Sequence, residues 1–504
     1  MNQRALALDA LRGYAIITMV LSATIISSIL PGWMSHAQTP PPEHIFNPEI
    51  PGITWVDLVF PFFLFAMGAA FPFSIGRHAE KGRSKLMLCY DAIKRGIQLT
   101  FFAIFIQHFY PYVISSPQDL RSWLLAITCF MVLFPMFMRI PYQLPEKIHK
   151  IIKLSAYLIA IIMLVTTQYA NERSFSLYFS NIIILILANM AIFGSLLYIF
   201  TIHNRLLRIC ILILLGALMI SKDIESSWVE HYLNISPIPW LYRFEYLEYL
   251  FIVIPGSFAG EILKKWLSEN HENIYPTKVR TGVALLSILV SVILVNLYCL
   301  YNRFLEANLI ITIILLTTGY LLLKGKPKTD IRTLWYKLFD LGSFFLLLGL
   351  FIEPFQEGIK KDYATFSYFF VTSGLAFMTL IIFNIICDYF KCVRSTRFLI
   401  MSGQNPMIAY VATDLLIYPI LNILGITPLL EYFYSSPWLG FLHGIYINKL
   451  NCIYNYVFYS YQMVLANFKI KDETIVSFIK YIFQVQANIF ALKQLSFTRK
   501  SIAL

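Results

Sequence analysis

The sequence predicts an all-α protein, a polytopic transmembrane helix bundle of roughly 11–13 spans whose N-terminus lies in the cytoplasm. Its 504 residues are 58% hydrophobic and only 13% charged, and the mean hydropathy is +0.66. Soluble domains carry about 25% charged residues, so this composition excludes a large soluble core. Because lipid-exposed backbone must satisfy its own hydrogen bonds, apolar runs of spanning length are expected to be helices.

Apolar runs of about 20 residues, the length that crosses a bilayer as a helix, recur along the whole chain. Residues 1–437 hold no polar stretch long enough for a soluble domain, so we expect them to form one membrane domain. Residues 438–504 are richer in Asn, Lys, Gln and Tyr and are expected to form a divergent, peripheral C-terminal tail, in which a weaker run near 437–459 could add a last span. The expected spans are residues 11–30, 53–76, 96–115, 121–138, 151–167, 178–200, 205–221, 248–263, 282–300, 308–323, 338–353, 366–387 and 399–423.

The distribution of Lys and Arg predicts the orientation, because cytoplasmic loops carry an excess of these residues. With the N-terminus inside, the inner segments hold 26 of the 40 Lys and Arg residues and the outer loops hold 7. Residues 31–52 and 354–365 then form extracytoplasmic loops. The same rule accounts for the net charge of +12, and no nucleic-acid-binding motif is present, so nucleic acid is not an expected partner.

The N-terminal 30 residues resemble a signal sequence, and Ser35-His36-Ala37 has the small-x-small pattern of a cleavage site. The apolar run is longer than a usual signal core and another span follows it, so we expect an uncleaved first helix. The seven cysteines are scattered and form no CxxC, which predicts neither a disulfide scaffold nor a metal site.

The stretch from Trp33 to Gly68 holds the residues best suited to chemistry. It reads WMSHA, which places His36 in the extracytoplasmic loop, and later GITWVDLVFPFFLFAMG, which places Asp57 at the start of the second span. An imidazole can act as a general base or an acyl acceptor, and a carboxylate can fix its tautomer. The plain alternatives are that His36 is a solvated loop histidine and that Asp57 caps a helix. For His44 the plain alternative is likewise a solvated loop histidine.

A second polar cluster follows Gly349 in the sequence GLFIEPFQEGIKKDYATFSYFF. It crowds carboxylates and two lysines beside aromatic residues in an outer loop, which suits a hydroxyl-rich substrate, although an ordinary solvated loop has the same composition. The two lysines also oppose the positive-inside trend. The cluster consists of Glu353, Glu357, Lys360, Lys361 and Asp362.

The order of three motifs resembles the start of the heparan-α-glucosaminide N-acetyltransferase family and its bacterial relatives. The motifs are LDALRGYAIITMVL, WMSHA and GITWVDLVFP, and the family pattern runs from D-x-x-R-G through a loop histidine to G-x-T-x-x-D-x-x-F-P. The later blocks EPFQEGIKKDYATFSYFFVTSGLA and GQNPMIAYV are similar to further segments of that family, so the resemblance covers residues 5–435. The matching residues of the first blocks are Asp9, Arg12, Gly13, Gly52, Thr54, Asp57, Phe60 and Pro61.

This resemblance implies a transmembrane acetyltransferase of the bacterial inner membrane. Cytoplasmic acetyl-CoA would supply the acetyl group, and the acceptor would be the amine of a glucosamine-type sugar or glycan on the other side. Expected partners are the lipid bilayer and this acceptor, with a homodimer as an option. The implied catalytic residues are His36 and Asp57; the substrate-binding residues are Trp33, His44, Thr54, Glu353, Lys360, Lys361 and Asp362; the acetyl-CoA-binding residues are Arg12, Arg77, Arg83, Arg95 and Asn405.

The chain departs from the family pattern at two places. Fifteen residues that include Pro40, Pro41 and Pro42 separate His36 from Gly52, so His44 competes with His36 for the histidine role, and we favour His36. The family has an asparagine near the outer end of its first span, where this chain has Ala23 beside Ser22.

The alternative function is a secondary transporter or a carrier of sugars or lipid-linked sugars. In that case the intramembrane residues Glu261, His108 and Asp340 would relay protons or bind substrate. Broken helices at matching places in the two halves of the chain would indicate such a transporter, and none is visible in the sequence.

Overall fold

The computed structural model describes residues 5–25, 30–137, 145–222, 224, 227–233, 235–269, 278–324, 330–431, 433 and 436–460. Helices dominate these residues and no strand occurs among them, which confirms the all-α prediction. The helices are α1 (Leu6–Thr24), α2 (Val59–Phe71), α3 (Arg77–Glu80), α4 (Lys85–His108), α5 (Pro111–Ile114), α6 (Leu120–Phe137), α7 (Glu146–Thr166), α8 (Ile182–Asn189), α9 (Ser195–Thr201), α10 (Arg205–Lys222), α11 (Trp228–Leu233), α12 (Leu250–Ser268), α13 (Val279–Tyr301), α14 (Leu305–Lys324), α15 (Asp330–Ile352), α16 (Phe366–Asn384), α17 (Val393–Gln404), α18 (Pro406–Ala412), α19 (Tyr418–Ile423), α20 (Thr427–Glu431) and α21 (Pro437–Ser460).

Short 3-10 and π turns join several of these helices into longer rods, such as Val56–Glu80, which contains α2 and α3. Within the described residues, eleven rods are long and apolar enough to cross a membrane. The protein is therefore an integral, multi-pass membrane protein. Two further expected spans, 96–115 and 205–221, fall on α4 and α10, whose ends carry more charged residues.

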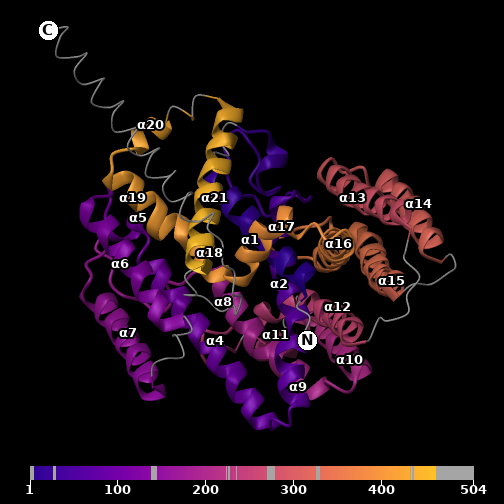
Figure 1. Ribbon diagram of the computed structural model, residues 1–504, viewed down its shortest axis with the longest axis horizontal. Helices are drawn as coiled ribbons and strands as arrows, with labels where there is room; N and C mark the ends of the chain where they lie inside the picture. Colours follow the sequence, from indigo (N-terminus) through magenta and orange to yellow (C-terminus); the bar gives the residue numbers. More distant parts are fainter. Residues whose placement is uncertain are drawn as a thin grey trace, which may run out of the picture.

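Burial separates central helices from peripheral ones. In the most apolar stretch of the α16 rod 89% of the residues are buried, against 17% in α7 and 22% in α14. In Figure 1, α1, α2 and α16 occupy the middle of the bundle, while α7 and α14 lie at opposite edges. The peripheral helices thus leave apolar faces for lipid, and the central helices carry the polar residues described below.

Glycines allow the central helices to approach one another at backbone distance. A Cβ atom on Gly13 of α1 would lie 1.7 Å from the carbonyl oxygen of Leu399 in α17, and one on Gly403 would lie 1.9 Å from that of Asp9. A Cβ atom on Gly68 of α2 would lie 1.9 Å from the carbonyl oxygen of Val253 in α12. Small residues at such crossings are the usual means of close helix packing in membranes. They fix α1 and α2, the two helices that flank the loop of His36.

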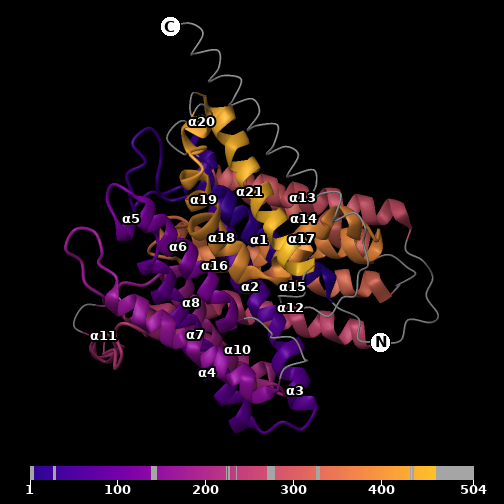
Figure 2. The ribbon, with the colours of Figure 1, turned by 60° about the vertical axis from the view of Figure 1, so that its left-hand side comes forward.

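The loops predicted to share one side of the membrane do meet in space. At one end, the amide of Gly52 donates to the carbonyl of Ile359 at 2.7 Å, and Arg303 pairs with Glu353. At the other end, Lys264 pairs with Glu80 at 2.7 Å. We call these the outer end and the inner end, after the orientation that the charge distribution predicts. Figure 2 shows the inner end around α3 and the opposite end around α20 and α21.

Two expectations about the last third of the chain need correction, although Pro406–Ile423 is confirmed as long and apolar enough to span a membrane. The predicted span 399–423 is interrupted: α17 ends at Gln404 and α18 begins at Pro406, because proline suits a first helical turn but lacks the N–H of an interior position. The first part of the tail is not peripheral, since α21 packs against α1 and α17 and buries His443 and Ile447. Residues 461–504 lie outside the described residues.

Candidate active site at the outer end

His36 and Asp57 form a close pair at the outer end of the bundle. The Nδ1 atom of His36 lies 2.6 Å from Oδ1 of Asp57, although 21 positions separate them in the sequence. Asp57 is 2% exposed, whereas the His36 side chain is 41% exposed. The carboxylate is therefore a fixed, buried support, and the imidazole is the part that a substrate could reach.

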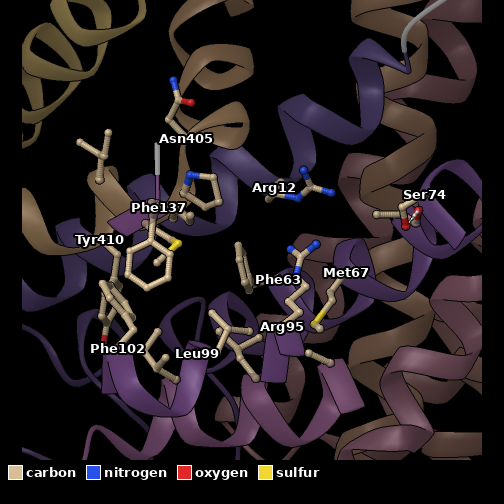
Figure 3. Close-up of a pocket in the computed structure, with 18 of the residues that line it drawn as sticks. Arg12, Phe63, Met67, Ser74, Arg95, Leu99, Phe102, Phe137, Asn405 and Tyr410 are labelled. Carbon is tan, nitrogen blue, oxygen red and sulfur yellow. Dashed lines mark hydrogen bonds between the residues drawn. The ribbon is translucent and has the colours of Figure 1, made fainter. Parts of the chain in front are cut away.

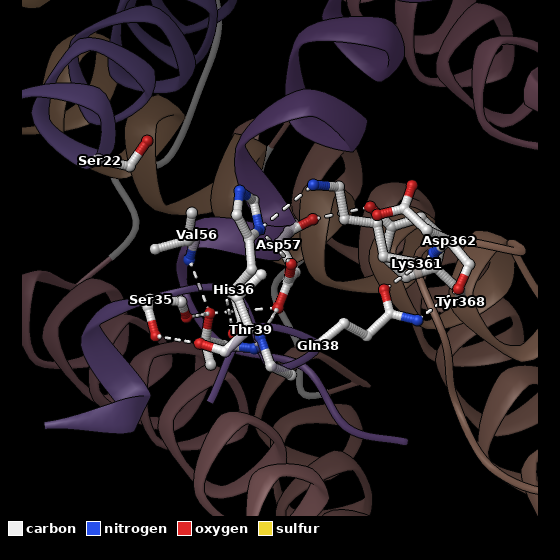
Figure 4. A network of polar contacts seen from close by, with 12 residues as sticks. Ser22, Ser35, His36, Gln38, Thr39, Val56, Asp57, Lys361, Asp362 and Tyr368 are labelled. Atoms are coloured by element: carbon white, nitrogen blue, oxygen red, sulfur yellow. Dashed lines mark hydrogen bonds and ion pairs between the residues drawn. The ribbon is translucent and has the colours of Figure 1, made fainter. Parts of the chain in front are cut away.

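The second oxygen of Asp57 is held by the loop around it. The amides of Thr54 and Ala37 donate to Oδ2 at 2.9 and 3.2 Å, and the hydroxyl of Thr54 lies 3.2 Å from the same atom. These donors leave Oδ1 as an acceptor for His36, so Nδ1 carries the proton and Nε2 keeps its lone pair. Figure 4 shows this network, with the Asp57 carboxylate beneath the ring. The carboxylate thus fixes the loop and supports the imidazole, whereas neither the 3-10 turn Val56–Leu58 nor α2 has a side-chain cap.

The loop that carries His36 is fastened to the loop 353–365. Gln38 bridges them: its amide oxygen accepts from the backbone N–H of Asp362 at 3.0 Å, and its amide nitrogen donates to the carbonyls of Asp362 and, at 3.0 Å, of Pro48. The hydroxyl of Tyr368 donates to the backbone carbonyl of Asp57 at 2.8 Å. These contacts bring together the two polar clusters that the sequence singles out.

The members of the second cluster have different surroundings. Lys361 reaches the catalytic candidate, with its Nζ 3.2 Å from Nδ1 of His36. Lys360 instead pairs with Glu49 at 2.9 Å and lies 3.7 Å from Glu357. Glu353 is buried against Arg303. Lys360 and Glu353 therefore hold the loops in place, and Lys361 is the cluster's side chain in contact with the imidazole.

His44 and Trp33 do not join the His36–Asp57 pair. The ring of His44 lies 3.1 Å from the carbonyl of Thr39, and its backbone has a positive φ of 49°. Trp33 is 48% exposed in the short turn Gly32–Met34. Of the two rival histidines, the structure places only His36 against a buried carboxylate.

A cavity of about 480 Å³ enters the bundle from the inner end. Exposed residues near its mouth are Ser74 and His78, and its walls are mostly apolar and aromatic, with Phe63, Phe102 and Phe137 among them (Figure 3). Its volume and apolar lining are in the usual range for a small-molecule or cofactor site.

Two arginines face this cavity from different helices. Arg12 of α1 and Arg95 of α4 both line it, and they lie close enough to repel each other electrostatically (Figure 3). Arg12 has Asp9 3.8 Å away, whereas Arg95 has no acidic partner among the residues that the structure describes. Like charges beside an apolar cavity are unfavourable unless an anion accompanies them. The geometry therefore suits an anionic ligand.

Three of the five residues predicted to bind acetyl-CoA line the cavity, and two do not. Asn405 joins Arg12 and Arg95; it is buried, and within the described residues both polar atoms of its side chain lack a partner. Arg83 instead pairs with Asp91 at 2.9 Å, and Arg77 is not part of the lining. Both belong to the basic surface of the inner end.

The cavity extends toward the His36 site. Met19 and Phe63 line it on α1 and α2. At 1.5 Å per residue, Phe63 lies about 9 Å along its helix from Asp57, and Met19 lies about 4.5 Å before Ser22, which Figure 4 shows near His36. Along the two helices, the cavity-lining residues Phe63 and Met19 thus lie within about two helical turns of Asp57 and Ser22, far less than the thickness of a bilayer.

Two of the three residues of the transporter alternative, Glu261 and His108, have structural partners. Glu261 pairs with Arg205 at 2.6 Å and with the fully buried Arg208 at 2.9 Å. His108 is bonded through Nδ1 to the carbonyl of Ile104, and its Nε2 accepts from the amide of Ser176 at 3.4 Å. Asp340 is exposed on α15.

Sequence reasoning missed Gln38 and Tyr368. Gln38 lies only two positions after His36, but an amide in a polar loop gives no sign of its backbone partners. Tyr368 bonds to a residue 311 positions away, and a tyrosine in an apolar run is indistinguishable from core. Only the packing of α16 against α2 identifies it.

Comparison with known proteins assigns a family without a described activity. No curated protein matches the chain. One family's sequence model matches residues 4–263, just over half of the 504 residues. The matched region contains Arg12, His36, Asp57 and Arg95 and ends within α12, so it omits Lys361 and Asn405. The chain therefore belongs to the family described as a domain of unknown function (DUF5009).

Proposed function

We propose that this protein is a transmembrane acetyltransferase that moves an acetyl group from cytoplasmic acetyl-CoA to the amine of an extracytoplasmic glucosamine-type sugar. The observation that carries the proposal is the His36–Asp57 pair, 2.6 Å apart, above a cavity that enters from the opposite end of the bundle. The motif resemblance to the heparan-α-glucosaminide N-acetyltransferase family supports the same reaction. The proposed location is the bacterial inner membrane.

The cavity suits the donor in charge and in shape. Arg12 and Arg95 would pair with the phosphates of CoA, and the apolar walls between Phe137 and Phe63 would hold its extended arm. Asn405, with an unsatisfied buried amide, would bond to polar atoms of that arm. The thioester would then lie near Met19 and Phe63, on the side of the cavity closest to His36.

The acceptor would approach His36 from the outside. With Nδ1 donating to Asp57, the Nε2 lone pair would take a proton from the sugar amine as its nitrogen attacks the thioester carbonyl. The tetrahedral intermediate would then collapse, the C–S bond would break, and the thiolate of CoA would take a proton from the imidazolium. General base catalysis of this kind contributes on the order of 10²- to 10⁴-fold.

The test uses purified protein in proteoliposomes with labelled acetyl-CoA and glucosamine on opposite sides. We expect labelled N-acetylglucosamine on the sugar side with wild type, loss of it in His36→Ala, and near wild-type transfer in His44→Ala. Loss in His44→Ala with retention in His36→Ala would assign the role to the other histidine. Uptake of the sugar without acetylation would refute the proposal and favour a transporter.

A further inference from the structure

Lys361 is a cation beside the proposed catalytic base. Among the residues that the structure describes, no carboxylate forms an ion pair with it. Its Nζ lies 3.2 Å from Nδ1 of His36 and is close enough to Asp57 to interact with it electrostatically. Because Nδ1 donates its proton to Asp57, it cannot also accept one from Lys361. Figure 4 shows the ammonium in contact with the edge of the ring. Because Nδ1 is not an acceptor in this tautomer, the N–H donors of Lys361 are left for another acceptor.

The other donors around the imidazole are already engaged. The amides of Thr54 and Ala37 point to Asp57, and the hydroxyl of Ser22 donates to the carbonyl of Met19 at 2.8 Å. The hydroxyl of Thr39 donates to the carbonyl of His36 at 3.1 Å. Within the described residues, Lys361 is thus the donor next to His36 that can turn to a new acceptor, and its flexible stem allows that movement.

We propose that Lys361 is a catalytic residue that stabilises the oxyanion formed when a nucleophile attacks an acyl carbonyl at His36. This inference rests on the proposed function and extends it. When the nucleophile's lone pair forms the new C–N bond, the C=O π electrons move to oxygen, and the ammonium of Lys361 pairs with that negative charge. When the C=O bond re-forms, the C–S electrons leave with sulfur as thiolate, and Lys361 returns unchanged to its place at the edge of the His36 ring.

The expected size of the effect follows from the exposure of the site. Loss of one donor from a water-excluded oxyanion site costs on the order of 10²- to 10³-fold in rate. The His36 side chain is 41% exposed, so water weakens the interaction, and we expect a loss of at least about tenfold.

The first experiment does not require acetyl transfer. Diethyl pyrocarbonate acylates imidazole through a tetrahedral oxyanion, so we would measure the rate of His36 carbethoxylation by peptide mass spectrometry at alkaline pH, where the rate no longer rises with pH. We expect Lys361→Met to slow it at least about tenfold and Lys361→Arg to stay within about threefold of wild type, since Arg keeps the charge. Arg121→Met, which removes an exposed cation elsewhere at the outer end, is the matched control, and the exposed His203 is the internal reference.

A rate for His36 in Lys361→Met equal to that of wild type would overturn the inference. If Lys361→Met also changes the rate at His203, its fold is altered, and Lys361→Gln and Lys361→Arg then decide: equal rates in these two overturn the inference, and a faster Arg variant supports it. In the acetyl-transfer assay the same substitutions should lower kcat with little change in KM for acetyl-CoA. Absence of acetyl transfer in wild type would refute the proposed function, while the carbethoxylation rates alone would still decide the role of Lys361.

Discussion

The substitution Asp57→Asn replaces one carboxylate oxygen by an NH₂ group. It tests whether the carboxylate decides which ring nitrogen of His36 carries the proton. Asp57 accepts from His36 through Oδ1 and from Thr54 and Ala37 through Oδ2. An amide has one oxygen and one donating nitrogen. If the amide nitrogen takes the Oδ2 position, two buried backbone donors lose their acceptor, and each unsatisfied donor costs about 1–3 kcal/mol of folding free energy. The amide nitrogen is therefore expected to take the Oδ1 position and face His36.

In that orientation the amide donates to Nδ1 of His36, so the proton of the imidazole moves to Nε2. The lone pair then points at the buried amide, and the nitrogen that faces the acceptor can no longer take a proton. We expect kcat to fall by about 10²- to 10⁴-fold, which corresponds to about 3–5.5 kcal/mol of transition-state stabilisation. Because the contacts to Thr54 and Ala37 survive, the free energy of unfolding should fall by no more than about 1–3 kcal/mol.

The assay is acetyl transfer at saturating acetyl-CoA and sugar, with thermal unfolding in detergent measured on the same samples. Glu43→Gln is the matched control, since Glu43 is an exposed carboxylate in the same loop, and its rate should equal that of wild type. If Asp57→Asn keeps more than about a third of the wild-type rate while remaining folded, the tautomer argument is wrong.

Three further outcomes are expected. Arg95→Gln should raise KM for acetyl-CoA by about 10- to 150-fold with little change in kcat, because a charge-assisted contact to phosphate contributes roughly 1.5–3 kcal/mol. Lys94→Gln, which changes an exposed neighbour over the ring of Tyr90, should leave KM unchanged, and equal effects of the two substitutions would argue against the cavity as the donor site. Gly13→Ala should lower the unfolding temperature in detergent, because the added Cβ atom would lie 1.7 Å from a backbone carbonyl oxygen. Gly194→Ala is the control and should be tolerated, because its Cβ atom would have only side-chain atoms as close neighbours, the nearest at 3.2 Å. Gln38→Ala should expose the loops 31–52 and 353–365 to limited proteolysis and reduce transfer; unchanged cleavage of both loops would contradict the bridging role.

Sequence alone determined the fold class, because hydropathy and run length are local properties that a bilayer converts directly into helices. It also grouped the loops of the outer end, since Lys and Arg counts report the side of the membrane without any knowledge of packing. Local pattern marked His36 and Asp57 as candidates but left a solvated loop histidine, a capping aspartate and the rival His44 open, and the motif resemblance was needed to favour His36 with Asp57.

Only the tertiary structure decided which charged residues act together. Arg12 and Arg95 come from helices far apart in the sequence, and their selection over Arg77 and Arg83 depends on which side chains line one cavity. Lys360 and Lys361 are adjacent in the chain, yet one pairs with Glu49 and the other contacts His36. The physical reason is the same in each case: a charge is given its role by the partner that folding places within a few ångströms, and contacts between distant segments leave no periodic trace in the sequence.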